Sequence, residues 1–147
     1  MIRYEHEEKI RTTPELAFAA IDDLPLTAKW LPPCVSLRKL GAGPNAVGDK
    51  LHYIYRQGGK QSEMEGKIID RVPGERLHCK YADSMFEVSV DLRVAPADGG
   101  TLTKHIIEMT PKTWLARSMS PLIRIGLRKQ THEAATNLRN LLESPSA

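Results

Sequence analysis

The chain has 147 residues and a formal net charge of +3, with 41% hydrophobic and 27% charged residues. This composition is ordinary for a globular protein, and the length predicts one domain, residues 1–147, that buries roughly 70% of the surface of the unfolded chain. Lys and Arg are dispersed among nearly as many acidic residues, so we expect no nucleic-acid partner.

Residues 2–10 alternate between apolar and charged side chains, which predicts a half-buried strand. Its apolar face carries Ile2, Tyr4, His6 and Ile10. The opening MIRYEHEEKI is too charged for a signal peptide, and no apolar run approaches membrane-spanning length. We therefore expect a cytoplasmic protein.

Two short helices are predicted after this strand. Thr13 is a suitable N-cap and Pro14 suits the first helical position, so the first helix should run to about Asp22. Pro25 opens a second helix, which should end near Trp30 because two prolines follow at once.

From residue 34 to 110 the spacing of turn residues indicates an antiparallel meander. The six expected strands are approximately 34–40, 49–57, 60–71, 76–82, 86–95 and 101–110. A two-residue turn at Gly58-Gly59 places Tyr53 opposite Met64, and pairing Val72 with Glu75 places Ile68 opposite Cys79. The turns and the apolar alternation agree on one inner face, with a bulge as the main risk to the register.

A long amphipathic helix is expected from about Thr113 to Glu143, with residues 143–147 as a frayed tail. Ser120 and Pro121 form an N-cap and first-turn pair, so the helix should restart or kink there. Gly126 falls on the apolar stripe, where its missing side chain would leave room beneath the helix.

This order of elements resembles the SRPBCC (START/birch-pollen-allergen-like) superfamily, and within it the polyketide cyclase/dehydrase-like branch. The resemblance covers nearly the whole chain and rests on TPELAFAAIDDLPLTAKWLP, VGDKLHYIY, VPGERLHCKY and TPKTWLARSMSPLIRIGLRKQ. It implies an α+β helix-grip fold, in which a curved seven-stranded antiparallel sheet wraps around the long C-terminal helix. It also implies a largely apolar cavity for a lipid, polyketide or aromatic molecule. The superfamily has no universal catalytic triad to transfer.

The inner rows of the sheet and the apolar stripe of the last helix supply the candidate cavity residues. They are Trp30, Tyr53, Tyr55, Met64, Cys79, Tyr81, Phe86, Val88, Val90, Leu92, Thr103, His105, Ile107, Met109, Met119, Leu122, Ile123 and Leu127. Each polar member could instead be satisfied within a dry core, and Trp30 could be either an aromatic at the mouth or a plug that seats the short helices.

His105 is the candidate catalytic residue, because burial would lower its pKa and keep the imidazole neutral as a base. His6 shares its face and should lie near it. The alternative is a hydrogen-bonded core histidine. His52 and His78 fall on the outer face, where we expect them to be solvated.

The two cysteines, Cys34 and Cys79, have no neighbour at metal-binding spacing, so we expect no metal site, no disulfide and no cofactor. We also expect no membrane attachment, since the apolar stripe of the last helix is needed to cover the sheet.

The leading hypothesis is a protein, monomeric or homodimeric, that binds a small hydrophobic ligand. One alternative is a polyketide cyclase or dehydratase that uses His105 and the tyrosines as acid and base. The other is an interaction module of the chaperone-activator kind.

Overall fold

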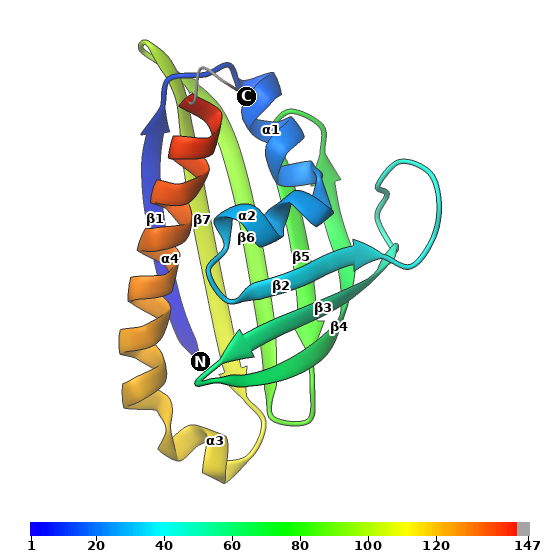
Figure 1. The fold of residues 1–147 in the computed structure, drawn as a ribbon, viewed down its shortest axis with the longest axis vertical. Helices are drawn as coiled ribbons and strands as arrows, with labels where there is room; N and C mark the ends of the chain where they lie inside the picture. The colour runs from blue at the N-terminus through cyan, green and yellow to red at the C-terminus, as the bar shows by residue number, and fades with distance from the viewer. Residues whose placement is uncertain (144–147) are drawn as a thin grey trace.

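The computed structural model describes residues 1–143 and shows the expected α+β helix-grip fold (Figure 1). Residues 144–147 of the predicted frayed tail lie outside this part, whereas Glu143 is the last residue of the final helix. The strands are β1 (Ile2–Ile10), β2 (Cys34–Lys39), β3 (Lys50–Gln57), β4 (Lys60–Val72), β5 (Arg76–Ala82), β6 (Phe86–Ala97) and β7 (Gly100–Pro111). The helical segments are α1 (Pro14–Asp22), the 3-10 turn η1 (Leu24–Leu26), α2 (Thr27–Trp30), α3 (Trp114–Ser118) and α4 (Ser120–Glu143).

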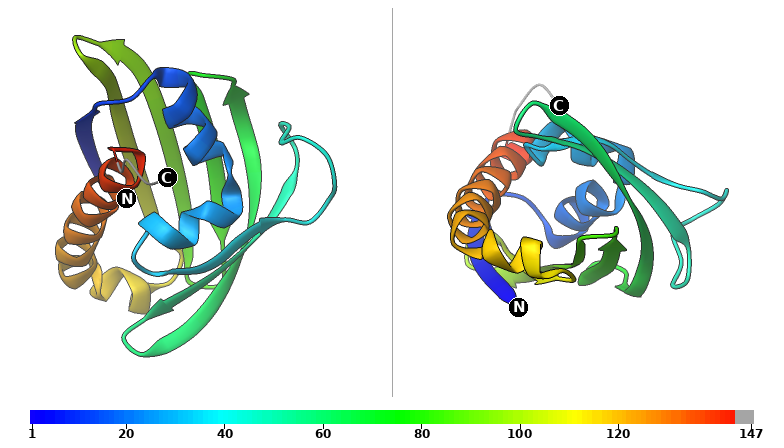
Figure 2. Two further views of the ribbon diagram at one scale, coloured as in Figure 1. Left: turned by 45° about the horizontal axis from the view of Figure 1, so that its top comes forward. Right: turned by 90° about the horizontal axis from the view of Figure 1, so that it is seen from below.

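One antiparallel sheet in the order β1-β7-β6-β5-β4-β3-β2 forms the body of the molecule. The sheet curves strongly, and both α4 and the α1–α2 segment lie on its concave side (Figure 2). The interior therefore has three walls, which are the sheet, the long helix and the pair of short helices.

The strand register follows the prediction, with one local difference. Across β3 and β4, Tyr53 pairs with Met64, and across β4 and β5, Ile68 pairs with Cys79, both as expected. At the turn between β4 and β5, however, Val72 pairs with Arg76 and not with Glu75. A bulge between Ile68 and Asp70 absorbs this one-residue shift, so the inner face of β5 is unchanged.

The C-terminal helix breaks at Met119, as the Ser-Pro pair predicted. Thr113 caps α3 by accepting a hydrogen bond from the amide of Ala116 (3.1 Å). Met119 has φ −87° and ψ −1°, which ends α3, and Ser120 is the first residue of α4 and not its N-cap. Pro121 is tolerated here because first-turn amides have no partner within a helix.

Small and apolar side chains seat the second half of α4 on β1 and the sheet. The buried residues of this face are Leu127, Thr131, Ala134, Ala135 and Leu138. Polar contacts then fix the position of the helix, since Arg139 pairs with Glu8 and the Asn137 amide donates to the carbonyl of Trp30 (3.1 Å).

An ion pair joins α1 to the sheet at its far end. Arg71 on β4 contacts Asp22 at 2.8 Å, and Asn45 also donates to the Asp22 carboxylate (2.9 Å). Burial would raise the pKa of Asp22, but these hydrogen bonds hold it below its usual value. The Arg71 guanidinium also stacks over the ring of Phe18 (5.6 Å).

Candidate functional site

A cavity of about 470 Å³ lies between the sheet, the short helices and the start of α4. This volume is typical of small-molecule sites. Every predicted cavity residue except Thr103 lines it: Trp30, Tyr53, Tyr55, Met64, Cys79, Tyr81, Phe86, Val88, Val90, Leu92, His105, Ile107, Met109, Met119, Leu122, Ile123 and Leu127.

Thr103 does not line the cavity, although it lies on the inward-facing row of β7, as expected. It is 7% exposed, and its hydroxyl donates to the carbonyl of Glu8 (3.0 Å). The residue therefore belongs to the contact between β1 and β7 and not to the cavity wall.

The short helices contribute a wall that the sequence prediction omitted. Ile21, Leu24, Thr27 and Leu31 all line the cavity. Apolar positions at three- and four-residue steps were the available signal, but that spacing cannot tell a cavity wall from a packed core.

Three tyrosines form an aromatic row along one side of the cavity. The Tyr53 ring stacks on Tyr55 (centroids 5.3 Å apart) and contacts Tyr81 (5.4 Å). Burial raises the pKa of Tyr53 and raises that of Tyr81 well above the usual value, so both hydroxyls stay protonated. Burial likewise raises the pKa of Cys79 to about 12, so this side chain is an inert thiol.

His105 is enclosed at the base of the cavity. It pairs with Leu92 across β6–β7, is 7% exposed, and meets the Trp30 ring edge-on (centroids 6.4 Å apart). Within residues 1–143 no side chain forms a hydrogen bond with its imidazole. Burial, with a smaller contribution from His6, lowers the pKa of His105 to about 4, and the ring is neutral at pH 7.

His6 lies opposite His105 but has other partners. Its Nε2 is 2.9 Å from Oε1 of Glu8, and its ring meets that of His132 edge-on at 5.0 Å. The two histidines are neighbours, as predicted, without being hydrogen-bonded to each other.

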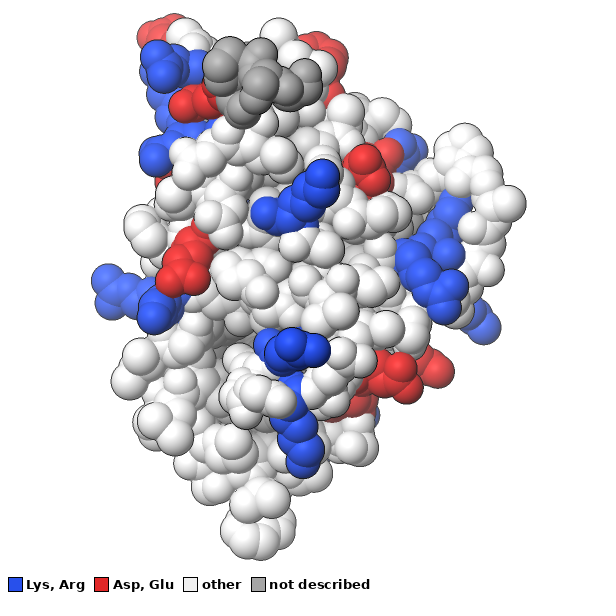
Figure 3. Space-filling model, in the orientation of Figure 1, with Lys and Arg blue, Asp and Glu red and all other residues white. Residues whose placement is uncertain are grey.

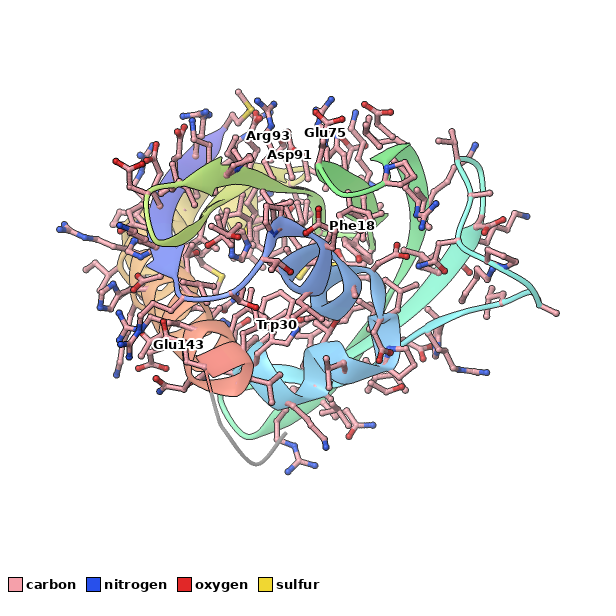
Figure 4. All side chains as sticks on the ribbon, turned by 90° about the horizontal axis from the view of Figure 1, so that it is seen from above. Phe18, Trp30, Glu75, Asp91, Arg93 and Glu143 are labelled. Atoms are coloured by element: carbon pink, nitrogen blue, oxygen red, sulfur yellow. The ribbon has the colours of Figure 1, made fainter. Side chains whose placement is uncertain are left out.

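Trp30 is the last residue of α2, is 3% exposed and lies beside α4 in the interior (Figure 4). This burial fits the plug interpretation and does not fit an aromatic at the mouth. Its Nε1 is buried without a partner in the described structure. A buried indole N–H without an acceptor lowers the free energy of unfolding, and an oxygen atom of a bound ligand could supply the missing acceptor.

The mouth of the cavity lies at the start of α4. Met119, Leu122 and Gly126 line the cavity from the helix and Lys60 lines it from the first position of β4, and all four residues are exposed to solvent. Gly126 lines the cavity and is exposed at its edge, and a Cβ built there would meet no atom within 4 Å, so the expected space at this position is present. Of the lining residues in the described chain, Lys60 alone carries a formal charge.

The outer face of the sheet carries a polar network that superficially resembles a catalytic triad. His78 Nε2 is 2.6 Å from Ser89 Oγ, and Asp91 is the cross-strand partner of His78. Arg76 donates to Nδ1 of His78 (3.3 Å), however, so Nε2 holds the proton and cannot accept one from Ser89. Burial would raise the pKa of Asp91, but Arg76 and Arg93 hold it down to about 2, and the network is structural.

Both outer histidines therefore have partners where we expected solvation. His52 Nε2 is 2.9 Å from Oε2 of Glu63. Among the described residues, no group of three or more His, Cys, Asp or Glu side chains is placed to hold a metal ion.

Comparison with known proteins agrees with this architecture. A START superfamily protein from Mycobacterium smegmatis superposes with a TM-score of 0.80 at 11% identity, covering 96% of this chain and 97% of the other. A protein from Thermus thermophilus gives 0.79 at 13% identity over 99% of both chains. The di-domain ARO/CYC protein StfQ of the steffimycin biosynthetic pathway gives 0.79 at 11% identity, with 97% of this chain matching 50% of that one.

At these identities the likeness establishes the fold alone. A search of curated proteins finds no match. The sequence family described as "Polyketide cyclase / dehydrase and lipid transport" matches residues 1–143. The chain therefore belongs to this polyketide cyclase/dehydrase and lipid transport family, within the SRPBCC superfamily.

Proposed function

We propose that the protein binds an uncharged hydrophobic molecule of lipid, polyketide or aromatic type in the cavity beneath α4. The observation that carries this proposal is an apolar cavity of about 470 Å³ with no ionised group in its interior. Desolvating a charged ligand there would be costly, since nothing inside could pair with it. Apolar walls with a few neutral donors suit a ligand with one or two oxygen atoms.

His105 is the polar group best placed to orient such a ligand. A neutral imidazole can donate from one nitrogen and accept at the other, and the described residues occupy neither position. A carbonyl or hydroxyl oxygen of the ligand would supply the missing partner. The size of the cavity also favours ligand binding over an interaction module with a dry core.

The second candidate is a cyclase or dehydratase, and the presence of a neutral His105 and protonated tyrosines in the same cavity favours it. With a pKa of about 4, however, His105 is a weak base at pH 7, which limits the proton transfer it could perform. We therefore place binding first and catalysis by His105 second.

Native mass spectrometry of the purified protein, followed by titration with the neutral fluorescent probe N-phenyl-1-naphthylamine, tests the proposal. A co-purified apolar mass, or saturable uptake of the probe, is expected. Gly126→Leu should weaken uptake about tenfold or more by filling the mouth, whereas Asn140→Leu, at an exposed position of the same helix, should not. A wild-type protein with neither a co-purified apolar mass nor probe uptake, or equal uptake by Gly126→Leu, would overturn it.

A further inference from the structure

The corner between α3 and α4 exposes a set of large apolar side chains. Its members are Trp114 (80% exposed), Leu115 (54%), Met119 (43%), Leu122 (73%) and Ile125 (70%). Single exposed apolar residues are common, but five within twelve positions form a patch that calls for a partner. Figure 3 shows the lower end of the molecule, where α3 and the start of α4 lie, as a largely uncharged surface.

Basic residues alternate with the apolar residues of this corner along the sequence, and acidic residues are absent from the same segment. No Asp or Glu occurs from residue 109 to 132. The same segment contains five exposed basic side chains: Lys112, Arg117, Arg124, Arg128 and Lys129. In the described chain, Arg117, Arg124, Arg128 and Lys129 form no salt bridge, so their charge is free to act on a partner.

Helical spacing puts the apolar and basic groups on one solvent-facing surface. Leu122, Ile125 and Lys129 follow the i, i+3, i+7 spacing of a single helix face. Arg124 and Arg128 lie one turn apart on the adjacent face, while Leu127 points inward and is buried.

We propose that this corner binds the surface of an anionic lipid bilayer. Trp is favoured at the membrane interface, Leu and Ile can enter the boundary of the acyl chains, and Arg and Lys pair with anionic headgroups. A second copy of the chain fits less well, because a two-fold contact would bring the two sets of unpaired basic residues together.

The sequence predicted no membrane attachment, and the packing of α4 explains the difference. That expectation assumed that the whole apolar stripe covers the sheet, but in the structure the buried face of α4 begins only at Leu127. The earlier stripe residues Met119 and Leu122 remain exposed to solvent, and so does Ile125, which was not part of the predicted stripe.

The corner also coincides with the mouth of the cavity, since Met119 and Leu122 belong to both. Docking would therefore place the mouth against lipid, and an apolar ligand could pass between cavity and bilayer without crossing water. This second step rests on the proposed function, whereas the docking itself does not.

The test is flotation with vesicles of phosphatidylcholine, with or without about one third phosphatidylglycerol, at an ionic strength of about 0.15 M. We expect binding to the anionic vesicles and about tenfold less to the neutral ones. Acrylamide quenching gives a second readout, because Trp114 is 80% exposed and Trp30 only 3%. Anionic vesicles should protect Trp114 from quenching.

Two double variants probe the corner without touching the cavity lining. Leu115→Ser/Ile125→Ser and Arg117→Glu/Arg124→Glu should each reduce vesicle binding about tenfold or more and leave uptake of the naphthylamine probe unchanged. Matched controls are Leu16→Ser/Val47→Ser, which are 59% and 60% exposed elsewhere, and the exposed Arg38→Glu on β2.

Lack of wild-type binding to anionic vesicles, or full binding by the corner variants, would overturn the docking proposal. So would a wild-type dimer that Leu115→Ser/Ile125→Ser converts to monomer in sedimentation, since the corner would then be an interface between copies. Loss of probe uptake with intact vesicle binding would instead overturn the proposed function and leave docking in place.

Discussion

His6 and His105 lie directly opposite each other across β1 and β7, on the same face of the sheet, yet they occupy contrasting environments. His6 has Glu8 as a partner, whereas His105 is enclosed among apolar groups that lower its pKa to about 4. Two histidines on the same face of the sheet therefore differ in pKa and in hydrogen bonding, because different side chains surround each imidazole.

The stability of the protein should depend on pH through His105. Its folded pKa of about 4 lies below the ordinary value of 6.5, so between these values the unfolded chain binds the extra proton. The free energy of unfolding should therefore fall as the pH falls through this window, by about 3 kcal/mol in total.

Urea unfolding of wild type and His105→Gln across this pH range measures that contribution. The variant lacks the titrating group, so its stability should change less on acidification. Parallel curves for the two proteins would show that His105 titrates normally and is not enclosed.

Two glycines should respond oppositely to alanine. At Gly66 a Cβ would lie 2.7 Å from Cε1 of Tyr81, so Gly66→Ala should destabilise the protein by about 1–3 kcal/mol and displace that ring. At Gly126 a Cβ meets nothing, and Gly126→Ala should stabilise the helix by about 0.5–1 kcal/mol. Thermal denaturation compares them, and a destabilised Gly126→Ala would mean that the space beneath the helix is absent.

The ion pair between Asp22 and Arg71 should anchor α1 to the sheet. Asp22→Ala removes a carboxylate that accepts from both Arg71 and Asn45, at a cost of about 1–3 kcal/mol. Because the folded pKa of Asp22 is lowered, this stabilisation is present above its unfolded pKa and is lost as pH falls through the folded pKa. A double-mutant cycle with Arg71→Ala measures the coupling free energy between the two side chains. A coupling free energy of zero would show that the ion pair does not stabilise the fold.

Hydrogen exchange should separate α3 from the rest of the C-terminal helix. Ala116 is the only residue of α3 that is buried, whereas α4 buries one side from Leu127 to Leu138. Amides of α3 should therefore exchange faster than those of residues 127–138, and bound ligand or anionic vesicles should slow them. Equal protection of both helices would indicate one rigid unit.

Most of the fold could be predicted because glycine-containing turns and apolar alternation restrict the same registers. The turn at Gly58-Gly59 correctly fixed the pairing of Tyr53 with Met64. The turn after Val72 was misjudged by one residue, since the bulge that compensates for it depends on local backbone geometry.

The site was harder to predict, because alternation along a strand shows which face a side chain lies on but not which other elements pack against that face. Thr103 and His105 lie on the same face of β7, but Thr103 is buried and hydrogen-bonded to β1, whereas His105 lines the cavity. Likewise, the apolar stripe that was predicted to run through Met119, Leu122 and Leu127 did not reveal where the helix leaves the sheet. That boundary depends on tertiary packing.

The neutrality of the cavity has a practical consequence for handling the protein. An occupant held by dispersion and one or two hydrogen bonds, with no ionic contact, should survive salt washes and ion-exchange columns. Detergent or an apolar resin would compete for it directly. A preparation that has never met detergent is therefore the one in which to look for the natural occupant.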